Sequence, residues 1–209
     1  GHQPVSASIG VVPRCQEECR PATIAEIEQY QIDFANAARR AVKAGYDLVE
    51  IHGAHGYLLS QFLSPLVNSR EDQYGGDAER RAALPCAVVR AVREAVGPDC
   101  WVQYRLGALD YREGGLDTAA AVAAARMLVA ASVDVIHISG GVHGPQAQDW
   151  DGESEGYHVE IAERVRQAID VPVIVPGAIR TPGFADRVVR DGKADLVAVG
   201  TAMLENPRW

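Results

Sequence analysis

The sequence predicts an α/β fold in which helices pack on a parallel β-sheet. Five short segments of almost uniformly apolar residues alternate with longer segments that have helical spacing. Such strands are typical of a parallel sheet that helices bury on both faces. No linker, low-complexity tract or charge run follows residue 22, so we expect a loop segment over residues 1–22 and one domain over residues 23–209. Periodicity alone does not distinguish a barrel from an open sheet.

The bulk composition excludes several classes of protein. The 209 residues are 47% hydrophobic and 23% charged, as in a globular protein with a sizeable core. The net charge of −8 argues against nucleic acid or an anionic membrane as a partner. No apolar stretch reaches the ~20 residues of a membrane span, and the first residues lack the features of a signal peptide, so we expect a cytoplasmic protein. Cys15 and Cys19 lie close in sequence but have no further ligands nearby, so we expect no metal site.

The first predicted helix has clear signals at both ends. Thr23 and Glu26 form the pattern of a capping box, in which each side chain satisfies a backbone N–H of the other. Apolar residues then recur at helical spacing until Gly45, which can adopt the left-handed conformation that ends a helix. The segment 47–51 follows as a short strand.

Four further helix–strand units follow the same pattern. Asp117 and Thr181 are expected N-caps, and Pro182 occupies the favoured first helical position. Pro85 either kinks its helix or opens the second part of it. The helices are expected at about residues 77–96, 116–133 and 157–169 and from Thr181 onward, and the strands that follow them at 100–106, 133–139, 171–177 and 194–200.

Polar and small residues cluster at the ends of all five strands. In a parallel α/β fold the chemistry collects at the rim, meaning the edge where the carboxyl ends of the strands lie. We therefore expect a ligand site there. The rim residues, in strand order, are His52, His55 and Tyr57; Arg105; Ser139, Gly140 and Gly141; Gly177 and Ala178; and Gly200 and Thr201.

The residue types at the rim suggest a reaction. The last two glycine turns suit a phosphate, because backbone N–H groups near helix starts can donate to an anion. Two histidines can donate to a carbonyl or phenol oxygen, and Tyr57 can deliver a proton. This set fits reduction of a polarised C=C bond. The simpler alternatives are a hydrogen-bonded loop or a metal site, but the strand phase of Glu50, the nearest carboxylate, is expected to point it elsewhere.

One long segment resembles a known family. The stretch "VEIHGAHGYLLSQFLSPLVNSREDQYGGDAERR" at 49–81 is similar to the signature of the old yellow enzyme family, and most similar to its bacterial NADH:flavin oxidoreductases related to 2,4-dienoyl-CoA reductase. The resemblance covers nearly all of residues 20–209. It continues through "VQYRLGALDYREGGLD", "VDVIHISGG", "VPVIVPGAIRTP" and "ADLVAVGTAMLENPRW".

The resemblance implies a (β/α)8 TIM barrel that binds FMN at the rim and uses NAD(P)H as reductant. His52 and His55 would hold the substrate oxygen, and Tyr57 would protonate the substrate carbon while flavin N5 gives a hydride. Arg105 would lie against the flavin pyrimidine edge. The other implied cofactor-binding positions are Gly140, Gly141, Gly177, Ala178, Gly200 and Thr201. In the loop after the first strand, Asn68, Arg70, Asp72, Tyr74, Gly75 and Gly76 are expected to be mostly structural.

Two departures from the family pattern keep alternatives open. Thr201 stands where the family has a phosphate-binding arginine, a loss of about 1–3 kcal/mol for a charge-assisted bond. Only five βα units are present, so we expect a homo-oligomer, or a partner chain or segment that completes the barrel. The rival functions are a non-catalytic scaffold and a flavin-independent enolisation that uses the same side chains.

The substrate is expected to be a small molecule with an activated double bond. The polar segment 142–157 follows the third strand and is expected to cover the site. His143 and Trp150 could touch substrate, although a solvent-facing loop is the preferred interpretation.

Overall fold

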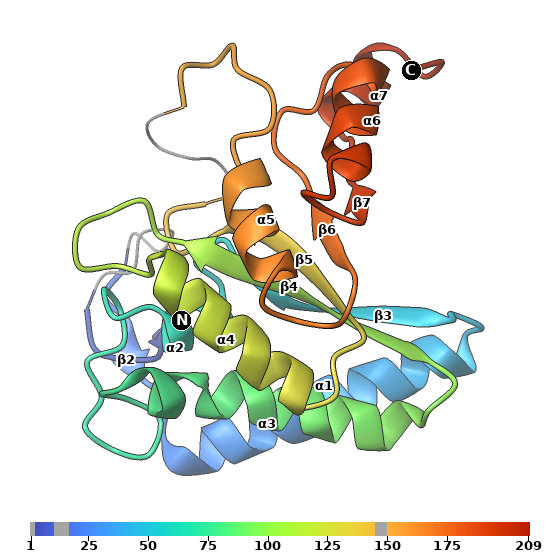
Figure 1. The fold of residues 1–209 in the computed structure, drawn as a ribbon. Coiled ribbons are helices and arrows are strands. Elements are labelled where there is room, and N and C mark those ends of the chain that lie inside the picture. The colour runs from blue at the N-terminus through green and yellow to red at the C-terminus, as the bar shows by residue number, and fades with distance from the viewer. Residues whose placement is uncertain (1–2, 11–16, 145–149) are drawn as a thin grey trace.

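Five parallel strands form the main sheet, in the order in which they occur in the sequence (Figure 1). The computed structural model describes residues 3–10, 17–144 and 150–209. All five strands expected from the sequence are present, although the last two are short. They are β3 (Leu48–Gly53), β4 (Trp101–Leu109), β5 (Val135–Gly140), β6 (Val173–Val175) and β7 (Leu196–Val197).

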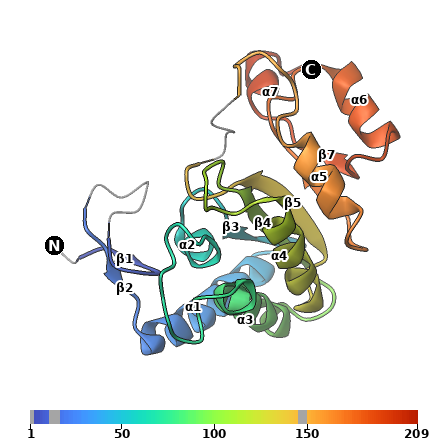
Figure 2. The same ribbon diagram turned by 60° about the vertical axis from the view of Figure 1, so that its left-hand side comes forward.

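The long helices follow one another around one face of this sheet (Figure 2). α1 (Ile24–Lys43) packs on α3 (Ala78–Val96), α3 contacts α4 (Thr118–Ala130), and α4 contacts α5 (Val159–Arg166). α6 (Pro182–Arg190) contacts β7. A sequential strand order without reversal, with helices on one side, is the arrangement of a barrel and not of a doubly wound open sheet. The sheet is therefore part of a βα barrel.

The two faces of the sheet carry different side chains, which corrects the expectation that helices bury both. Toward the helices, β4 and β5 present residues that are fully buried in the core: Val102, Tyr104, Leu106, Ala108, Ile136 and Ile138. Glu50, Gln103 and His137 alternate with these apolar positions and lie on the other face, where they contact one another. The strands are therefore not uniformly apolar, because these three positions carry polar or charged side chains.

The expected helix signals are confirmed. Thr23 and Glu26 form the reciprocal capping box of α1, and Gly45 follows its C-cap with φ +94°. Asp117 accepts a backbone N–H at the start of α4, and Thr181 caps α6 with Pro182 at its first turn. α3 runs as one helix from Ala78 to Val96 with Pro85 inside it.

Some elements were not expected. β1 (Val5–Ser6) and β2 (Arg20–Pro21) pair in parallel within the segment expected to be loop. α2 (Leu58–Leu63) and α7 (Thr201–Glu205) are short helices that begin at the rim. Cys19, Cys86 and Cys100 are buried, whereas Cys15 lies outside the described residues. Within the described ranges, no helix combines the length and apolarity that a membrane crossing requires.

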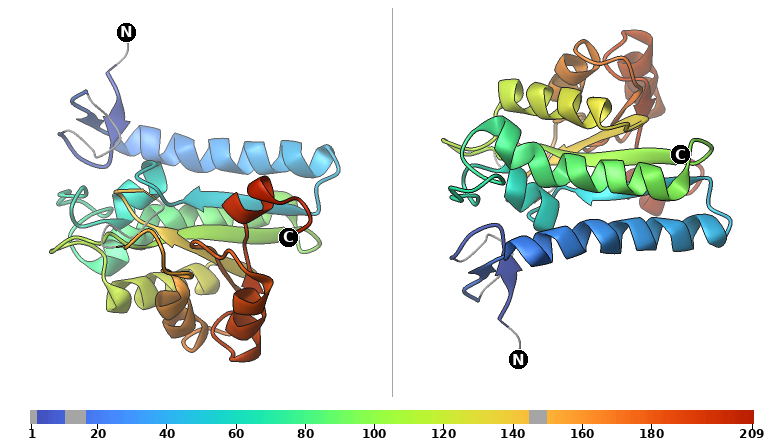
Figure 3. Two further views of the ribbon diagram at one scale, coloured as in Figure 1. Left: turned by 90° about the horizontal axis from the view of Figure 1, so that it is seen from above. Right: turned by 90° about the horizontal axis from the view of Figure 1, so that it is seen from below.

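The sheet has an open edge along β3. α1 runs beside this edge as the outermost helix (Figure 3). A mostly apolar groove of about 420 Å³ lies between the helix and the strand, with Phe34, Ala41, Tyr46 and Leu48 among its lining residues. Among the described residues no further strand pairs with β3 on this side. A strand edge with such a groove beside it is a surface that a further strand or segment can cover.

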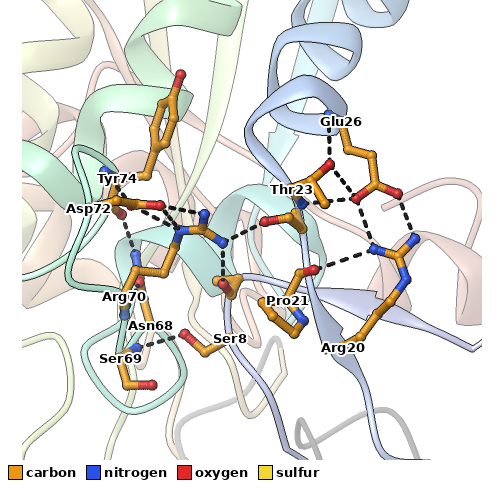
Figure 4. Close-up of polar contacts among 12 residues, drawn as sticks. Ser8, Arg20, Pro21, Thr23, Glu26, Asn68, Ser69, Arg70, Asp72 and Tyr74 are labelled. Atoms are coloured by element: carbon orange, nitrogen blue, oxygen red, sulfur yellow. Dashed lines mark hydrogen bonds and ion pairs between the residues drawn. The ribbon is translucent and has the colours of Figure 1, made fainter.

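Arg70 connects the N-terminal strand pair to the loop that follows α2 by hydrogen bonds (Figure 4). Its Nη1 donates to the carbonyl oxygens of Ala7, at 2.9 Å, and Ala22, at 2.8 Å. Its Nε and Nη2 bind the carboxylate of Asp72. Gly75 must lack a side chain here, because a Cβ would lie 2.2 Å from the Arg70 carbonyl oxygen. These contacts agree with a structural role for the loop.

We expect Arg70→Ala to lower the free energy of unfolding by about 2–4 kcal/mol, because two buried carbonyls and the Asp72 carboxylate lose their donor. Urea unfolding followed by circular dichroism measures this change. Arg80→Ala removes the exposed ion pair with Asp77 and is the matched control, with little expected effect. Equal stability of the two variants would contradict the assigned role of Arg70.

A second ion pair at the same end of the molecule predicts a pH dependence. Arg20 and Thr23 hold the pKa of the Glu26 carboxyl at about 2, well below its ordinary 4.5, chiefly through the bidentate Arg20 bond (Figure 4). A carboxyl with a lowered folded-state pKa contributes stability above its unfolded pKa and loses it as the pH falls. The contribution of Glu26 is therefore complete above about pH 4.5 and disappears toward pH 2.

We expect the stability difference between the wild type and Glu26→Gln to be largest above pH 4.5 and to vanish near pH 2. Unfolding measured at a series of pH values tests this. Glu28→Gln, at an exposed position on the same helix, is the control and should follow the wild-type profile. A difference that does not change with pH would show that the Glu26 ion pair does not contribute in this way.

Candidate functional site

The register of the sheet brings the rim residues of three strands together. His52 on β3 is the parallel partner of Arg105 on β4, and Arg105 is in turn the partner of His137 on β5. Gly107 and Ser139 pair two residues further toward the rim. Adjacent strands lie about 4.8 Å apart, so these side chains are direct neighbours.

The segment after β3 folds into a tight turn that gathers its aromatic side chains. His55 and Gly56 both adopt left-handed backbone conformations, with φ of 60° and 77°. The ring of His52 lies 5.0 Å from that of His55 and 5.1 Å from that of Tyr57, measured between centroids. Tyr57 is the N-cap residue of α2 and is half exposed. The three side chains predicted to act together therefore form one cluster.

β5 fixes this turn from the other side. The backbone N–H of His55 donates to the carbonyl oxygen of Gly140 at 3.1 Å. Nε2 of the buried His55 ring lies 2.6 Å from the Ser139 hydroxyl. Gly140 and Gly141, predicted to bind cofactor, thus lie beside His55, and the structure gives both of them backbone contacts at the rim.

The residue directly after His52 is constrained by a side chain on the next strand. A Cβ at Gly53 would lie 2.1 Å from the phenol oxygen of Tyr104. Tyr104 is fully buried, and its burial raises the pKa of the phenol. The Tyr104 ring therefore fills the space that a side chain at position 53 would need.

Arg105 supplies a positive charge in the middle of the site. Its Nε is buried and has no hydrogen-bond partner among the residues that the structure describes. Burial raises the pKa of Tyr157, and the charge of Arg105 partly opposes this effect. Tyr157 lies just before α5 and was not singled out from the sequence. The only signal in the sequence was its position at the end of a polar loop.

The expectation that Glu50 points away from the rim residues is wrong. Glu50 and His52 are two positions apart on one strand, so their side chains share a face. The Glu50 carboxylate contacts Nδ1 of His137 at 2.7 Å and also binds the Gln103 amide. Desolvation raises the pKa of Glu50, but the bonds and charges of His137, Gln103 and Arg105 outweigh it, so the pKa is lowered overall.

The turns after β6 and β7 share one pocket of about 230 Å³. Its lining includes the four predicted turn residues Gly177, Ala178, Gly200 and Thr201, together with Trp150, Tyr157 and Arg180. Gly177 and Ala178 both have positive φ, 119° and 50°. The structure therefore brings the two glycine turns together, as the sequence predicted.

Arg180 adds to this pocket a cation that was not singled out from the sequence. Its guanidinium donates to the carbonyl oxygens of Gly152, at 2.6 Å, and Glu153, at 2.5 Å, and packs over the Trp150 ring. The only sequence signal was an arginine shortly after a strand-end glycine. The contacts also hold the end of the rim loop beside the pocket. His143 lies in the turn after β5 and is half-buried, and residues 145–149 of the loop lie outside the described residues.

A buried carboxylate connects the loops of the rim. Asp110 follows β4 and is fully buried. Its Oδ2 accepts from the Ser64 hydroxyl at 2.6 Å and from the N–H of Leu116 at 2.8 Å. Its Oδ1 accepts from the N–H of Val142 at 2.9 Å. One side chain therefore joins the end of α2, the loop before α4 and the end of β5.

We expect Asp110→Asn to lower the free energy of unfolding by about 2–4 kcal/mol, because one carboxylate oxygen that accepts a buried bond is replaced by an amide donor. Denaturant unfolding measures the loss. Asp117→Asn is the control, since asparagine caps a helix as well as aspartate does. Wild-type stability of Asp110→Asn would show that this carboxylate does not hold the rim together.

Comparison with known proteins places the chain in a family. The sequence matches the profile of the NADH:flavin oxidoreductase / NADH oxidase family over residues 2–209. It is 39% identical to the NADH oxidase of Thermoanaerobacter brockii over 211 residues, which is 100% of this chain and 32% of that protein. It is 40% identical to the NADPH dehydrogenase of Geobacillus thermodenitrificans over 187 residues, which is 90% of this chain and 54% of that protein.

A solved structure gives the same result for the fold. The old yellow enzyme homologue from Zymomonas mobilis superposes with a TM-score of 0.79 at 26% identity, over 100% of this chain and 60% of that one. The chain thus spans between about a third and three fifths of the length of the proteins that it matches. The chain belongs to the NADH:flavin oxidoreductase / NADH oxidase family, the old yellow enzyme family, and carries five consecutive βα units of its TIM barrel.

Proposed function

We propose that the protein to which this chain belongs is an FMN-dependent NAD(P)H oxidoreductase that reduces activated C=C bonds. The observation that carries the proposal is the clustering of His52, His55 and Tyr57 beside Arg105 at one rim. A pure scaffold has no physical use for that set. The names of the relatives, NADH oxidase and NADPH dehydrogenase, support a nicotinamide reductant.

The residues at the rim suit FMN. Arg105 places a guanidinium beside His52 at the rim, and a fixed cation there suits the negative charge of a reduced flavin. The pocket at Gly177, Ala178, Gly200 and Thr201 suits the phosphate, and Arg180 brings to it a cation that Thr201 does not supply. The positions proposed to bind cofactor are therefore Arg105 and the glycine turns, with Gly140 and Gly141 packed beside them.

Each side chain has a role that its surroundings support. When bound, FMN would supply the hydride. His52 and His55 would donate to the carbonyl oxygen of the substrate, and the Ser139 hydroxyl helps to fix the orientation of the His55 ring. Tyr57 would deliver the proton to the substrate carbon, because it is half exposed on the open side of the cluster. Arg105 would stabilise negative charge near the flavin.

A partner-dependent subunit is the second candidate. The open edge of β3, with its apolar groove beside α1, favours this arrangement. In that case a further chain or segment would cover the edge before flavin binds. Flavin-independent enolisation has no observation of its own in its favour, because Arg105 and the glycine turns would then have no ligand.

FMN titration of the purified full-length protein tests the proposal. We expect a shift of the visible flavin absorbance, a rise in melting temperature that depends on FMN concentration, and NAD(P)H oxidation in the presence of an enone. A subunit would show these only with its partner. Absence of flavin binding under both conditions would refute the flavoenzyme assignment.

We expect Tyr57→Phe to slow reduction of an enone about 100-fold or more, because a general acid contributes about 10²–10⁴ to the rate. Reduction of the flavin by NAD(P)H should not change, since it needs no proton from Tyr57. Stopped-flow absorbance separates the two half-reactions. Tyr46→Phe, at an exposed tyrosine before β3, is the control. An unchanged enone step would exclude Tyr57 as the proton donor.

A further inference from the structure

Three polar and charged side chains on the concave face of the sheet, which is the face opposite the helices, have no role in the reaction proposed above. Glu50, Gln103 and His137 come from three adjacent strands and contact one another beneath the rim. The side chains of His137 and Glu50 are only 12% and 30% exposed. A partly exposed ion pair or polar network contributes little net stability. The group therefore calls for an explanation other than stability.

The contacts of His137 define which atom of its ring is available. Nδ1 lies 2.7 Å from a carboxylate oxygen of Glu50, so Nδ1 carries a proton and donates it to that oxygen. In the neutral ring Nε2 is then an acceptor. Nε2 is buried and, within the described part of the chain, has no partner. Gln103 donates to the same carboxylate and holds it toward His137.

A matching donor lies on the neighbouring strand. Arg105 is the parallel partner of His137, so the two side chains project side by side from one face of the sheet. Nε of Arg105 is likewise buried and lacks a partner among the described residues. One buried acceptor and one buried N–H donor thus face the same space. Leaving both unsatisfied would be unfavourable, because a buried polar group without a partner loses the hydrogen bonds that it makes with water.

We propose that Glu50 and His137 form a positioning pair for Arg105. Nε2 of His137 accepts the Nε–H of Arg105, directly or through one water molecule, and Glu50 fixes the ring tautomer that makes this possible. The guanidinium end of Arg105 is then held toward the rim, where its charge acts on both Glu50 and Tyr157. Neither Glu50 nor His137 needs to touch substrate or cofactor.

The pair also prevents a competing contact. His137 and Gln103 lower the pKa of the Glu50 carboxyl most, and the charge of Arg105 lowers it further. With His137 in place, that carboxylate is occupied by His137 and Gln103. Without His137, Arg105 is free to turn toward Glu50 and form an ion pair, which would withdraw its charge from the rim. The inference about charge at the flavin rests on the proposed function, whereas the contact between His137 and Arg105 does not.

NMR of the flavin-free full-length protein tests the contact directly. We expect the Arg105 Nε–H to exchange with water at least tenfold faster in His137→Phe than in the wild type, because the phenyl ring keeps the volume and removes Nε2. His137→Gln is the matched variant, because its amide oxygen can reach the position of Nε2 and should keep exchange slow. If His137→Phe does not fold, His137→Asn, whose amide reaches only the Nδ1 position, takes its place. Unchanged exchange in a folded variant would overturn the proposal.

The midpoint potential of the FMN-loaded protein tests the consequence. In His137→Phe we expect the affinity for reduced flavin relative to oxidised flavin to fall about tenfold, which is about 30 mV for a two-electron couple. The double variant Glu50→Gln/His137→Phe should recover part of this loss, because the competing carboxylate charge is gone. An unchanged potential in His137→Phe would also overturn the proposal. If no flavin binds, the proposed function fails and the NMR result alone decides the role of the pair.

Discussion

The carboxylate of Asp110 connects three loops of the rim. It lies where β4 ends and accepts bonds from the loop after α2, the loop before α4 and the backbone after β5. The close packing around it leaves no room for a side chain at Gly141, where a Cβ would lie 2.1 Å from Oδ1. The His55 turn is bonded to Gly140, directly before this glycine, so the positions of the candidate catalytic side chains follow from the same carboxylate. The buried Asp110 carboxylate thus fixes the positions of three loops through its hydrogen bonds.

Further charged side chains lie on the concave face of the sheet, beneath the rim loops that Asp110 connects. The charge of Arg105 acts on both the carboxylate of Glu50 and the phenol of Tyr157. In a sheet interior the direction in which such a cation points decides which neighbour it stabilises. The register of β3, β4 and β5 puts Glu50, Gln103, Arg105 and His137 within reach of one another. A barrel strand therefore contributes both to the reactive cluster at the rim and to the support beneath it.

Much of the fold could be predicted from the sequence, because its signals are local. Each helix start is determined within four residues, as at the Thr23 capping box, the Asp117 cap and the Thr181–Pro182 start. The rim cluster was predictable because strand ends meet at one edge. The orientation of Glu50 was predicted wrongly, although the period of two along β3 contained the answer. Arg180 and Tyr157 were missed because their position depends on contacts between loops far apart in sequence. α2 was missed because the segment Leu58–Leu63 directly follows a motif whose polar residues dominated the interpretation.

The contact between Gly53 and Tyr104 has a consequence for how this protein can change during evolution. The ring of Tyr104 occupies the space in which even a methyl group at position 53 would have to lie. A larger residue at position 53 is therefore compatible with the fold only if position 104 becomes smaller at the same time. The two codons are 51 positions apart, yet they should vary as a pair among relatives. Gly53 is then required by the volume of the Tyr104 side chain on the neighbouring strand and not by the chemistry.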